Sequence, residues 1–465
     1  MPASKNCEAY GLIPGYFVEG VDAIQAYTQA PWDGVPTWVE LAYEWWPESW
    51  KQRFTKEDRP VALLLFNLYG HPQAGPRFER WADVQFRSIG YMPIENWRSC
   101  YFHPQKESFL IAYVDDIMLS GPLRWKHKAW AEIRNVIDVE QPAAIDRYLG
   151  CYHHWGIIQN GPAEGARSCE WQMIEYLNGA VQRYKEVSGV TSFKKVLSPH
   201  IDERSLNDLD FEIKGELEDN ACSVIMGIFY GARLGRWDLM QPTTDLSRYV
   251  TKWCRAHDKK LLRLVSYIAA TVNKTMSGYV GDCAKDLKLR LYVDSDHGGD
   301  LFDRKATSGV LLVLEGPRTW FPLASMSKRQ TSTSNGSTEA ETVALSTALR
   351  LDGLPTKALW ELLLGRKMEL AVMEDNDCAI LAVQKGYSPT LRYLTITQGV
   401  SISLLHDIVC VHELADLLQI DTEEQAADIF TKAVKVCSYE NGVRMLNIKD
   451  RSEVVDSVIE CLRRS

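Results

Sequence analysis

The chain has 465 residues, of which 46% are hydrophobic and 24% are charged. These fractions are ordinary for globular proteins, and the length predicts about two or three domains at roughly 100 to 200 residues each. The formal net charge is −9, so any surface that binds nucleic acid must be a local cluster of Lys and Arg, because phosphate contacts need cations.

Cysteine spacing and hydropathy exclude several protein classes. The 11 cysteines contain no Cys-x-x-Cys pair, which excludes a zinc ribbon and a thioredoxin-like motif. No apolar run approaches the roughly 18 residues of a membrane span, and no signal peptide is recognisable. We therefore expect an intracellular protein, in the cytoplasm or the nucleus, without membrane contact. The adjacent His153 and His154 are expected to be strand side chains rather than metal ligands.

The first part of the chain predicts one acidic turn and one amphipathic helix. Residues 1 to 21 are expected to be irregular. Asp22 then stands in an otherwise apolar and amide run, where a strand-to-turn acid that caps a short helix is the simplest interpretation. Residues 77 to 86 predict a helix with one apolar face, which consists of Phe78, Trp81, Ala82 and Phe86.

A pair of carboxylates separates two short apolar runs between residues 109 and 121. The pattern predicts a strand, a tight turn and a second strand, with Asp115 and Asp116 at the bend. Two like charges between apolar strands are costly unless solvent, hydrogen bonds or cations compensate them. One interpretation is a Mg²⁺ site, because hard oxygen ligands without nearby His or Cys favour that ion. The other is a solvated hairpin turn.

The rest of the chain predicts a mixture of strands and helices. Helices are predicted at residues 125 to 139, 221 to 230 and 246 to 272. Every second residue from Leu287 to Val293 is apolar, which predicts a half-buried strand that delivers Asp294 at its end. Further strands are predicted at residues 310 to 314, 319 to 323 and 370 to 373, and a helix at 338 to 351, with Leu351 on its buried stripe and Pro355 as its breaker.

Acidic residues recur at the ends of these elements. Glu341 lies in the predicted helix, Asp375 follows the strand at 370 to 373, and a capping box at 422 to 425 predicts a helix that carries Asp428 about two turns in. A two-metal nuclease requires carboxylates from separate parts of the chain. Many ordinary acidic surfaces have the same pattern, so an acidic surface without a metal site is the alternative. Residues 454 to 462 predict a terminal helix with one apolar face.

The tetrad Tyr-Val-Asp-Asp at residues 113 to 116 resembles the active-site hairpin of reverse transcriptases. Its surroundings resemble the Pol polyproteins of copia-type LTR retrotransposons: Asp22 opens an Asp-x-x-x-Ala-aromatic pattern, and residues 70 to 76 resemble the family's Leu-Tyr-Gly-Leu-Lys-Gln-Ala stretch, without its Lys. The resemblance implies three metal ligands, which are Asp22, Asp115 and Asp116. It also implies nucleotide or template contacts, which are Tyr27, Gln73 and Tyr113.

The second half resembles the copia-type ribonuclease H domain. The resemblance rests on Tyr-Val-Asp-Ser-Asp from residue 292, Ser-Thr-Glu-Ala-Glu from 337, Asp-Asn from 375 and Ala-Asp-Ile-Phe-Thr-Lys from 427. It implies that four acids bind two Mg²⁺ or Mn²⁺ ions, namely Asp294, Glu341, Asp375 and Asp428. His297 stands where the family has Trp, and residues 392 to 398 lack the family's basic and histidine residues.

Together these features predict an α/β (α+β) fold in four parts. They are an incomplete reverse-transcriptase palm at residues 1–155, a helical thumb or connection at 156–285, a ribonuclease H-like mixed sheet with helices at 286–435, and a helical tail at 436–465. The palm is expected to be incomplete because the family's fingers lie mostly upstream of the acid that Asp22 matches.

The resemblance implies an RNA-directed DNA polymerase and ribonuclease H. Expected partners are an RNA template, an RNA/DNA hybrid and deoxynucleoside triphosphates. Further expected partners are an upstream Pol polypeptide that carries the fingers, or a second copy of this chain in a homodimer. The alternative is a catalytically inactive retroelement relic, or a module that binds nucleic acid or protein. The net negative charge favours this alternative, whereas the two sets of acids favour the enzyme.

Overall fold

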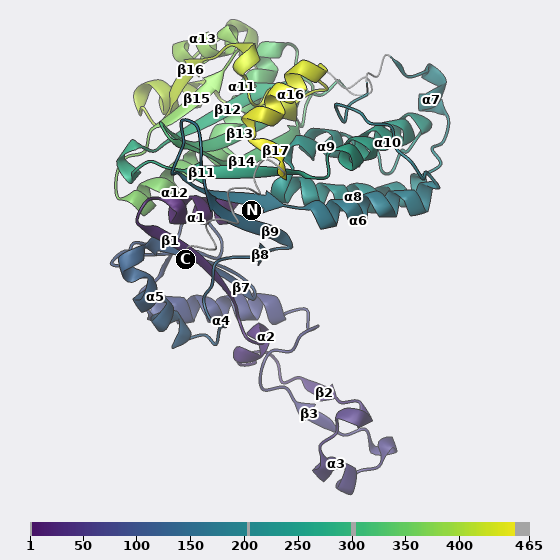
Figure 1. Ribbon diagram of the computed structural model, residues 1–465, viewed down its shortest axis with the longest axis vertical. Coiled ribbons are helices and arrows are strands. Elements are labelled where there is room, and N and C mark those ends of the chain that lie inside the picture. Colours follow the sequence, from purple (N-terminus) through teal and green to yellow (C-terminus); the bar gives the residue numbers. More distant parts are fainter. Residues whose placement is uncertain (1, 202–204, 299–303, 452–465) are drawn as a thin grey trace. The chain divides into compact units, whose positions relative to one another are not determined.

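A computed structural model of the chain describes residues 2–201, 205–298 and 304–451 (Figure 1). The predicted α/β class is confirmed, because helices and strands are interspersed along the chain and the larger sheet has both parallel and antiparallel pairs. Within the described residues, no helix is long and apolar enough to cross a membrane.

The chain divides into two compact units. Residues 16–145 form the smaller unit, and the first 15 residues join the chain from residue 146 onward to form the larger one. The larger unit thus contains both the predicted connection at 156–285 and the predicted ribonuclease H region at 286–435. The four-part division remains a prediction from the sequence.

The smaller unit is built on an antiparallel sheet with the strand order β1-β7-β6-β5-β4. These strands are β1 (Tyr16–Asp22), β4 (Met92–Pro93), β5 (Cys100–His103), β6 (Ser108–Tyr113) and β7 (Asp116–Pro122). Helices α4 (Ala74–Ser88) and α5 (Lys126–Arg134) share one hydrophobic core with this sheet. The predicted apolar face of α4 is buried in that core at Phe78, Ala82 and Phe86, with Trp81 partly buried beside it.

Residues 26 to 66 of the smaller unit form short elements. They are α2 (Ala26–Gln29), α3 (Glu48–Arg53) and a two-stranded sheet of β2 (Trp38–Glu40) and β3 (Val61–Leu63). Trp38 and Trp45 are exposed here. Only three backbone pairs join β2 to β3.

The larger unit is built on a mixed sheet with the order β16-β15-β12-β13-β14-β11-β10-β9-β8, and β17 pairs with β11. Its strands are β8 (Arg147–Tyr148), β9 (Cys151–Ile157), β10 (Arg167–Gln172), β11 (Lys274–Val280), β12 (Lys288–Ser295), β13 (Thr307–Gly316), β14 (Thr319–Arg329), β15 (Leu370–Glu374), β16 (Asp416–Gln419) and β17 (Ile448–Asp450). Among the described strands of this sheet, β15 alone runs parallel to its neighbours, which are β12 and β16. The predicted strands beginning near residues 287, 310, 319 and 370 are all present.

Helices of the larger unit cluster in two groups along the chain. The first group follows β10 and consists of α6 (Ile174–Ser188), α7 (Asp208–Glu212), α8 (Glu218–Gly235), α9 (Met240–Ser247) and α10 (Arg255–Ala270). The second group consists of α11 (Ser337–Ala348), α12 (Leu354–Leu364), α13 (Asp377–Lys385), α14 (Leu394–Gln398), α15 (Ile402–His406) and α16 (Val436–Met445). Helix α11 packs against β12 and β13.

The prediction that residues 1 to 21 are irregular is wrong. Helix α1 (Pro2–Leu12) is buried almost all round, and β1 follows it. The sequence of α1 carries no amphipathic pattern because its polar side chains are also buried and bonded within the larger unit. Asn6, for example, accepts a hydrogen bond of 2.6 Å from the Trp360 indole. Tertiary partners therefore stabilise a helix that periodicity does not reveal.

Three predicted helices differ from those observed. The helix predicted at 125 to 139 is shorter, since α5 ends at Arg134, and the helix predicted at 246 to 272 is interrupted between α9 and α10. Helix α11 ends at Ala348 in a π-turn, where Leu351 is exposed, and Pro355 lies in the first turn of α12. Proline is tolerated there because the first helical N–H groups have no intrahelical partner.

The helix predicted from the capping box at 422 to 425 is absent. Two 3₁₀ turns, Thr422–Glu424 and Asp428–Phe430, take its place. Gln425 leaves the helical region of backbone conformation, and its side-chain amide donates to the Val293 carbonyl of β12 at 2.9 Å. The hydrogen bond to the sheet thus outcompetes the local helix signal. The predicted apolar helix at 454 to 462 lies outside the described residues.

Candidate active sites

Asp294 is the penultimate residue of β12 in the interior of the larger unit, where the residue is 2% exposed. The Thr431 hydroxyl donates to its Oδ2 at 2.6 Å, and the Lys432 ammonium lies 3.8 Å from the same oxygen. The 427–431 turn reaches this position because it packs directly on Gly309, the residue paired with Asp294 across β12 and β13. A Cβ at Gly309 would come within 2.7 Å of the Ala427 carbonyl.

Two further carboxylates converge on Asp294. Asp375 directly follows β15, and because β15 runs parallel to β12, the carboxyl ends of both strands meet at the same edge of the sheet. Glu341 comes from α11, which packs on β12 and β13. One carboxylate oxygen from each of Asp294, Glu341 and Asp375 lies within 4.8 Å of the others. Three of the four acids predicted for this site are thus in one group.

Asp428, the fourth predicted acid, lies beside this group. Its Oδ1 is 2.7 Å from the Lys432 ammonium, which lies close to Asp294 as well. Burial would lower the pKa of Lys432, but the carboxylates of Asp294 and Asp428 outweigh it and raise that pKa. Lys432 therefore links the fourth acid to the group as a shared cation.

Burial dominates the electrostatics of this carboxylate group. It raises the pKa of Asp294 to about 7, although Lys432 opposes the rise, and it raises the pKa of Glu341, with the charges of Glu374 and Asp294 adding to the effect. Oε2 of Glu341 is buried and accepts no hydrogen bond from any described residue. Buried carboxylate oxygens without donors are stabilised by a proton or by a cation.

Glu374 is a buried acid that the sequence analysis did not assign to the site. It is fully buried as the last residue of β15, and burial raises its pKa to about 8. Its Oε2 also lacks a hydrogen-bond donor among the described residues. The available signal was the alternation of Leu370, Val372 and Glu374, which places the glutamate on the same face of β15 as two buried apolar residues.

The smaller unit brings the other three predicted acids together at a hairpin. Asp22 ends β1 and is paired with Asp116, the first residue of β7. Asp115 lies in the turn between β6 and β7, and its carbonyl accepts a hydrogen bond of 2.7 Å from the Ala23 backbone. Val114 adopts a left-handed conformation with φ of 58°, an uncommon one for a β-branched residue.

Asp22, Asp115 and Asp116 interact electrostatically but lie less close together than the group around Asp294. Burial, followed by the charges of Asp115 and Asp22, raises the pKa of Asp116 to about 6. Asp116 is only partly buried. Among the described residues, three acidic oxygens within 4.8 Å of one another occur at Asp294, Glu341 and Asp375, and not at the hairpin.

Two of the predicted nucleotide and template residues lie at this hairpin: Tyr113 ends β6, and Tyr27 interacts with Asp115. The Tyr27 ring lies 4.6 Å from the Tyr69 ring, centroid to centroid. Burial raises the pKa of Tyr27, with further contributions from Asp115, Tyr69 and Tyr113. Tyr113 itself is exposed. Gln73 precedes α4, and its side-chain oxygen accepts hydrogen bonds from the Arg77 guanidinium at 2.8 and 3.2 Å.

Comparison with known proteins places the chain in context. It is 22% identical over 276 residues to a transposon Ty5-1 protein of Saccharomyces cerevisiae, a match that covers 57% of this chain and 83% of that protein. It is 23% identical over 386 residues to the retrovirus-related Pol polyprotein from transposon TNT 1-94 of Nicotiana tabacum. The chain is a homologue of Ty/copia-type retrotransposon Pol polyproteins. The tobacco match covers 80% of this Pol homologue but only 27% of the tobacco polyprotein.

Other comparisons are narrower. A stretch of 127 residues, 27% of this Pol homologue, is 33% identical to secreted RxLR effector protein 161 of Plasmopara viticola and covers 84% of that protein. A crystal structure of prototype foamy virus protease–reverse transcriptase matches 90% of the chain and 45% of its own chain at 13% identity, with a TM-score of 0.20. We infer nothing from a score this low. No protein-family model matches the chain.

Proposed function

We propose that this Pol homologue is a metal-dependent phosphoryl-transfer enzyme whose larger unit cuts the RNA strand of RNA/DNA hybrids. The observation that carries the proposal is the convergence of Asp294, Glu341 and Asp375, with one carboxylate oxygen of each within 4.8 Å of the others. Three carboxylates gathered this closely, two of them buried, need compensation of their charge. Homology to Pol polyproteins supports a nucleic acid substrate.

Mg²⁺ or Mn²⁺ fits the donors of this group. All the donors are carboxylate oxygens, which hard divalent cations prefer, and Oε2 of both Glu341 and Glu374 is buried without a donor. Bound as a pair, such ions would activate water and stabilise the leaving 3′ oxygen. Asp294, Glu341, Asp375 and Asp428 would hold them. An RNA strand is distinguished from DNA by its 2′-hydroxyl groups.

The neighbouring polar residues would orient these ligands. The Thr431 hydroxyl occupies one oxygen of Asp294, and the Thr422 hydroxyl donates to Oδ2 of Asp375 at 2.8 Å. Each hydrogen bond fixes one carboxylate oxygen. Lys432 would neutralise part of the negative charge before a metal binds.

The smaller unit would serve RNA-directed DNA synthesis. In this proposal Asp22, Asp115 and Asp116 bind the catalytic Mg²⁺ ions, while Tyr27, Gln73 and Tyr113 contact the deoxynucleoside triphosphate or the RNA template. The pairing of Asp22 with Asp116 at the hairpin supports it. A separate Pol polypeptide that carries the family's basic fingers would complete the polymerase.

The cleavage proposal is tested with a labelled RNA/DNA hybrid and the purified full chain. We expect RNA cleavage with Mg²⁺ or Mn²⁺, and none after chelation. Asp375→Asn should reduce the rate by on the order of 100-fold or more, because it removes a metal ligand and conserves volume. Asp377→Asn is the matched control, since Asp377 lies two residues further on and its side chain is exposed.

Two results would contradict the proposal. Equal rates for Asp375→Asn and wild type would show that Asp375 binds no catalytic metal. A folded wild-type protein that leaves the hybrid intact with both metals would favour the catalytically inactive relic or interaction module, which agrees with the net charge of −9.

A further inference from the structure

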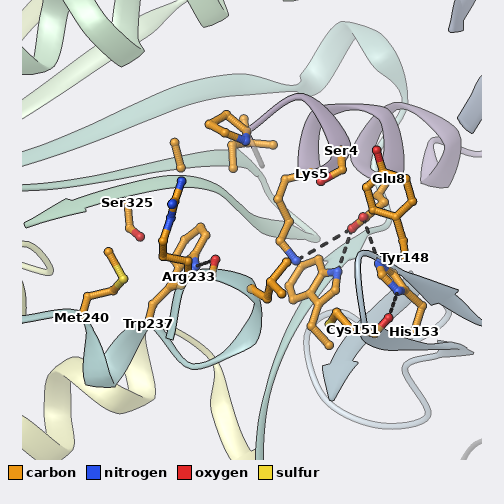
Figure 2. Close-up of a pocket in the computed structure, with 15 residues that line it drawn as sticks. Ser4, Lys5, Glu8, Tyr148, Cys151, His153, Arg233, Trp237, Met240 and Ser325 are labelled. Atoms are coloured by element: carbon orange, nitrogen blue, oxygen red, sulfur yellow. Dashed lines mark hydrogen bonds and ion pairs between the residues drawn. The ribbon is translucent and has the colours of Figure 1, made fainter. Parts of the chain in front are cut away.

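The larger unit contains a second group of potential metal ligands, at a cavity of about 130 Å³. Figure 2 shows this cavity, with Lys5 and Glu8 reaching from α1 toward His153 and Cys151 of β9. Carboxylate, imidazole and thiol groups lie here together, whereas the Asp294 group contains only carboxylates. The two groups therefore suit different metals.

Glu8 and His153 line this cavity, and Cys169 brings a third ligand atom close to theirs. Oε1 of Glu8 lies 3.1 Å from Nε2 of His153, and Glu8, His153 and Cys169 each place one ligand atom within 4.8 Å of the other two. All three side chains are at least nine-tenths buried. They come from α1, β9 and β10, so the group joins three separate elements of the larger unit.

Hydrogen bonds orient two of these ligands. Nδ1 of His153 lies 3.0 Å from the Cys151 carbonyl, and since a carbonyl can only accept, Nδ1 is the donor. The neutral ring then presents a lone pair on Nε2. The Trp171 indole donates to Oε2 of Glu8 at 2.7 Å, which leaves Oε1 available. Outer hydrogen bonds of this kind fix the ring orientation and tautomer of histidine ligands in metal sites.

The short contact between Glu8 and His153 requires a proton or a cation between these groups. A neutral His153 and an ionised Glu8 would place two lone-pair acceptors 3.1 Å apart. Lys5 does not remove this repulsion, because its ammonium lies 4.0 Å from the other carboxylate oxygen and 3.0 Å from the centre of the Trp171 ring. Either a proton lies between them, on His153 or on Glu8, or a cation binds there.

We propose that Glu8, His153 and Cys169 bind a zinc ion that fastens α1 to β9 and β10. Imidazole and thiolate ligands select zinc over Mg²⁺. The charges balance, because one glutamate and one thiolate neutralise a divalent ion, and the Cys169 proton is released to solvent on binding. The cavity has room for a water as the fourth ligand. The neighbouring His154 does not join the site, since its Nε2 pairs with Gln172 at 2.9 Å.

Co²⁺ titration of the metal-free full chain tests this site, because only thiolate ligands give an intense sulfur-to-cobalt charge-transfer band. We expect one equivalent of Co²⁺ to produce the band, Zn²⁺ to abolish it, and excess Mg²⁺ to leave it unchanged. Cys169→Ser should lower the affinity by at least about 100-fold. Cys100→Ser is the matched control, since Cys100 is an equally buried thiol of the smaller unit.

Glu8→Gln provides a second variant in case Cys169→Ser fails to fold. The glutamine oxygen can still accept from Trp171, but the ligand charge is lost, so the band should need at least about 10-fold more Co²⁺. Zinc should also slow tryptic cleavage within the first 15 residues in the wild type and not in Glu8→Gln. The absence of a band in folded wild type, or equal bands in wild type and both variants, would overturn the proposal in favour of a proton between His153 and Glu8.

Discussion

The two acidic sites of this Pol homologue contain the same functional groups but differ in burial. Asp294 is the penultimate residue of a strand that is covered by α11 and by the turn at 427–431, and it is almost fully buried. Asp116 begins the second strand of a hairpin and is only partly buried. The buried group therefore needs a proton or a cation for compensation, whereas solvent can screen much of the charge at the hairpin.

The largest expected effect separates the two sites. Asp294→Asn should reduce hybrid cleavage by on the order of 100-fold or more, since it removes a ligand shared by the group, and it should leave primer extension unchanged. Asp115→Asn combined with Asp116→Asn should do the reverse. Extension is measured on an RNA template with fingers supplied by an upstream Pol polypeptide.

Two results would contradict the prediction that the two sites act independently. If primer extension persists after the double substitution, the hairpin is not the polymerase site. If both variants lose hybrid cleavage, one site depends on the other. Circular dichroism of each variant establishes that it is folded before the rates are compared.

A second prediction concerns the pH dependence of stability without metal. Burial raises the folded-state pKa of Asp294 to about 7 and that of Glu374 to about 8. Each group therefore binds its proton more tightly when folded, so the free energy of unfolding of the larger unit should fall as the pH rises from about 4 to about 8. In the smaller unit, the pKa of Asp116 is raised to about 6. The decrease in the free energy of unfolding that Asp116 causes should therefore be complete about two pH units lower than in the larger unit.

Urea unfolding at several pH values, with and without Mg²⁺, measures this difference. Mg²⁺ should remove most of the pH-dependent decrease in the free energy of unfolding of the larger unit, because the bound cation replaces the protons. Asp294→Asn should flatten the metal-free curve, whereas Asp377→Asn should not. A metal-free larger unit that becomes more stable between pH 4 and pH 8 would show that these carboxylates are compensated in another way.

The smallest expected effect concerns how the Asp428 turn is positioned. Gly309→Ala places a Cβ against the Thr431 side chain and the Ala427 carbonyl, so it should lower the free energy of unfolding by about 1–3 kcal/mol and slow cleavage. Gly179→Ala in α6 is the control, because a Cβ there meets no atom within 4 Å. That change should raise stability by up to about 1 kcal/mol. If Gly309→Ala were as stable as the wild type, the turn at 427–431 would be able to shift away from β13 without a loss of stability.

The sequence predicted those parts of the fold that follow a regular pattern. The alternation before Asp294 identified β12, and the apolar runs around Asp115 identified the hairpin. Helix α1 escaped prediction because distant partners satisfy its buried polar side chains. The helix predicted from residue 422 is also absent because of a tertiary contact, since Gln425 donates a hydrogen bond to β12 and does not continue a helix.

For the candidate sites, the sequence identified the acids but not their grouping. The convergence of Asp294 with Asp375 depends on the parallel pairing of β12 and β15, which no local pattern specifies. Glu374 was missed because a glutamate at the end of a strand is usually solvated, and its burial becomes visible only in the folded chain. The cation-binding role of all these acids remains a prediction.

The central claim is that the group around Asp294 binds divalent metal, and Mn²⁺-soaked crystals of the full chain test it most directly. Anomalous diffraction at the manganese edge should give a strong peak within bonding distance of oxygens from Asp294, Glu341 and Asp375, and this peak should disappear in Asp294→Asn. The absence of a manganese peak at these three side chains in an ordered wild-type crystal, with Lys432 still paired to Asp294, would contradict the account.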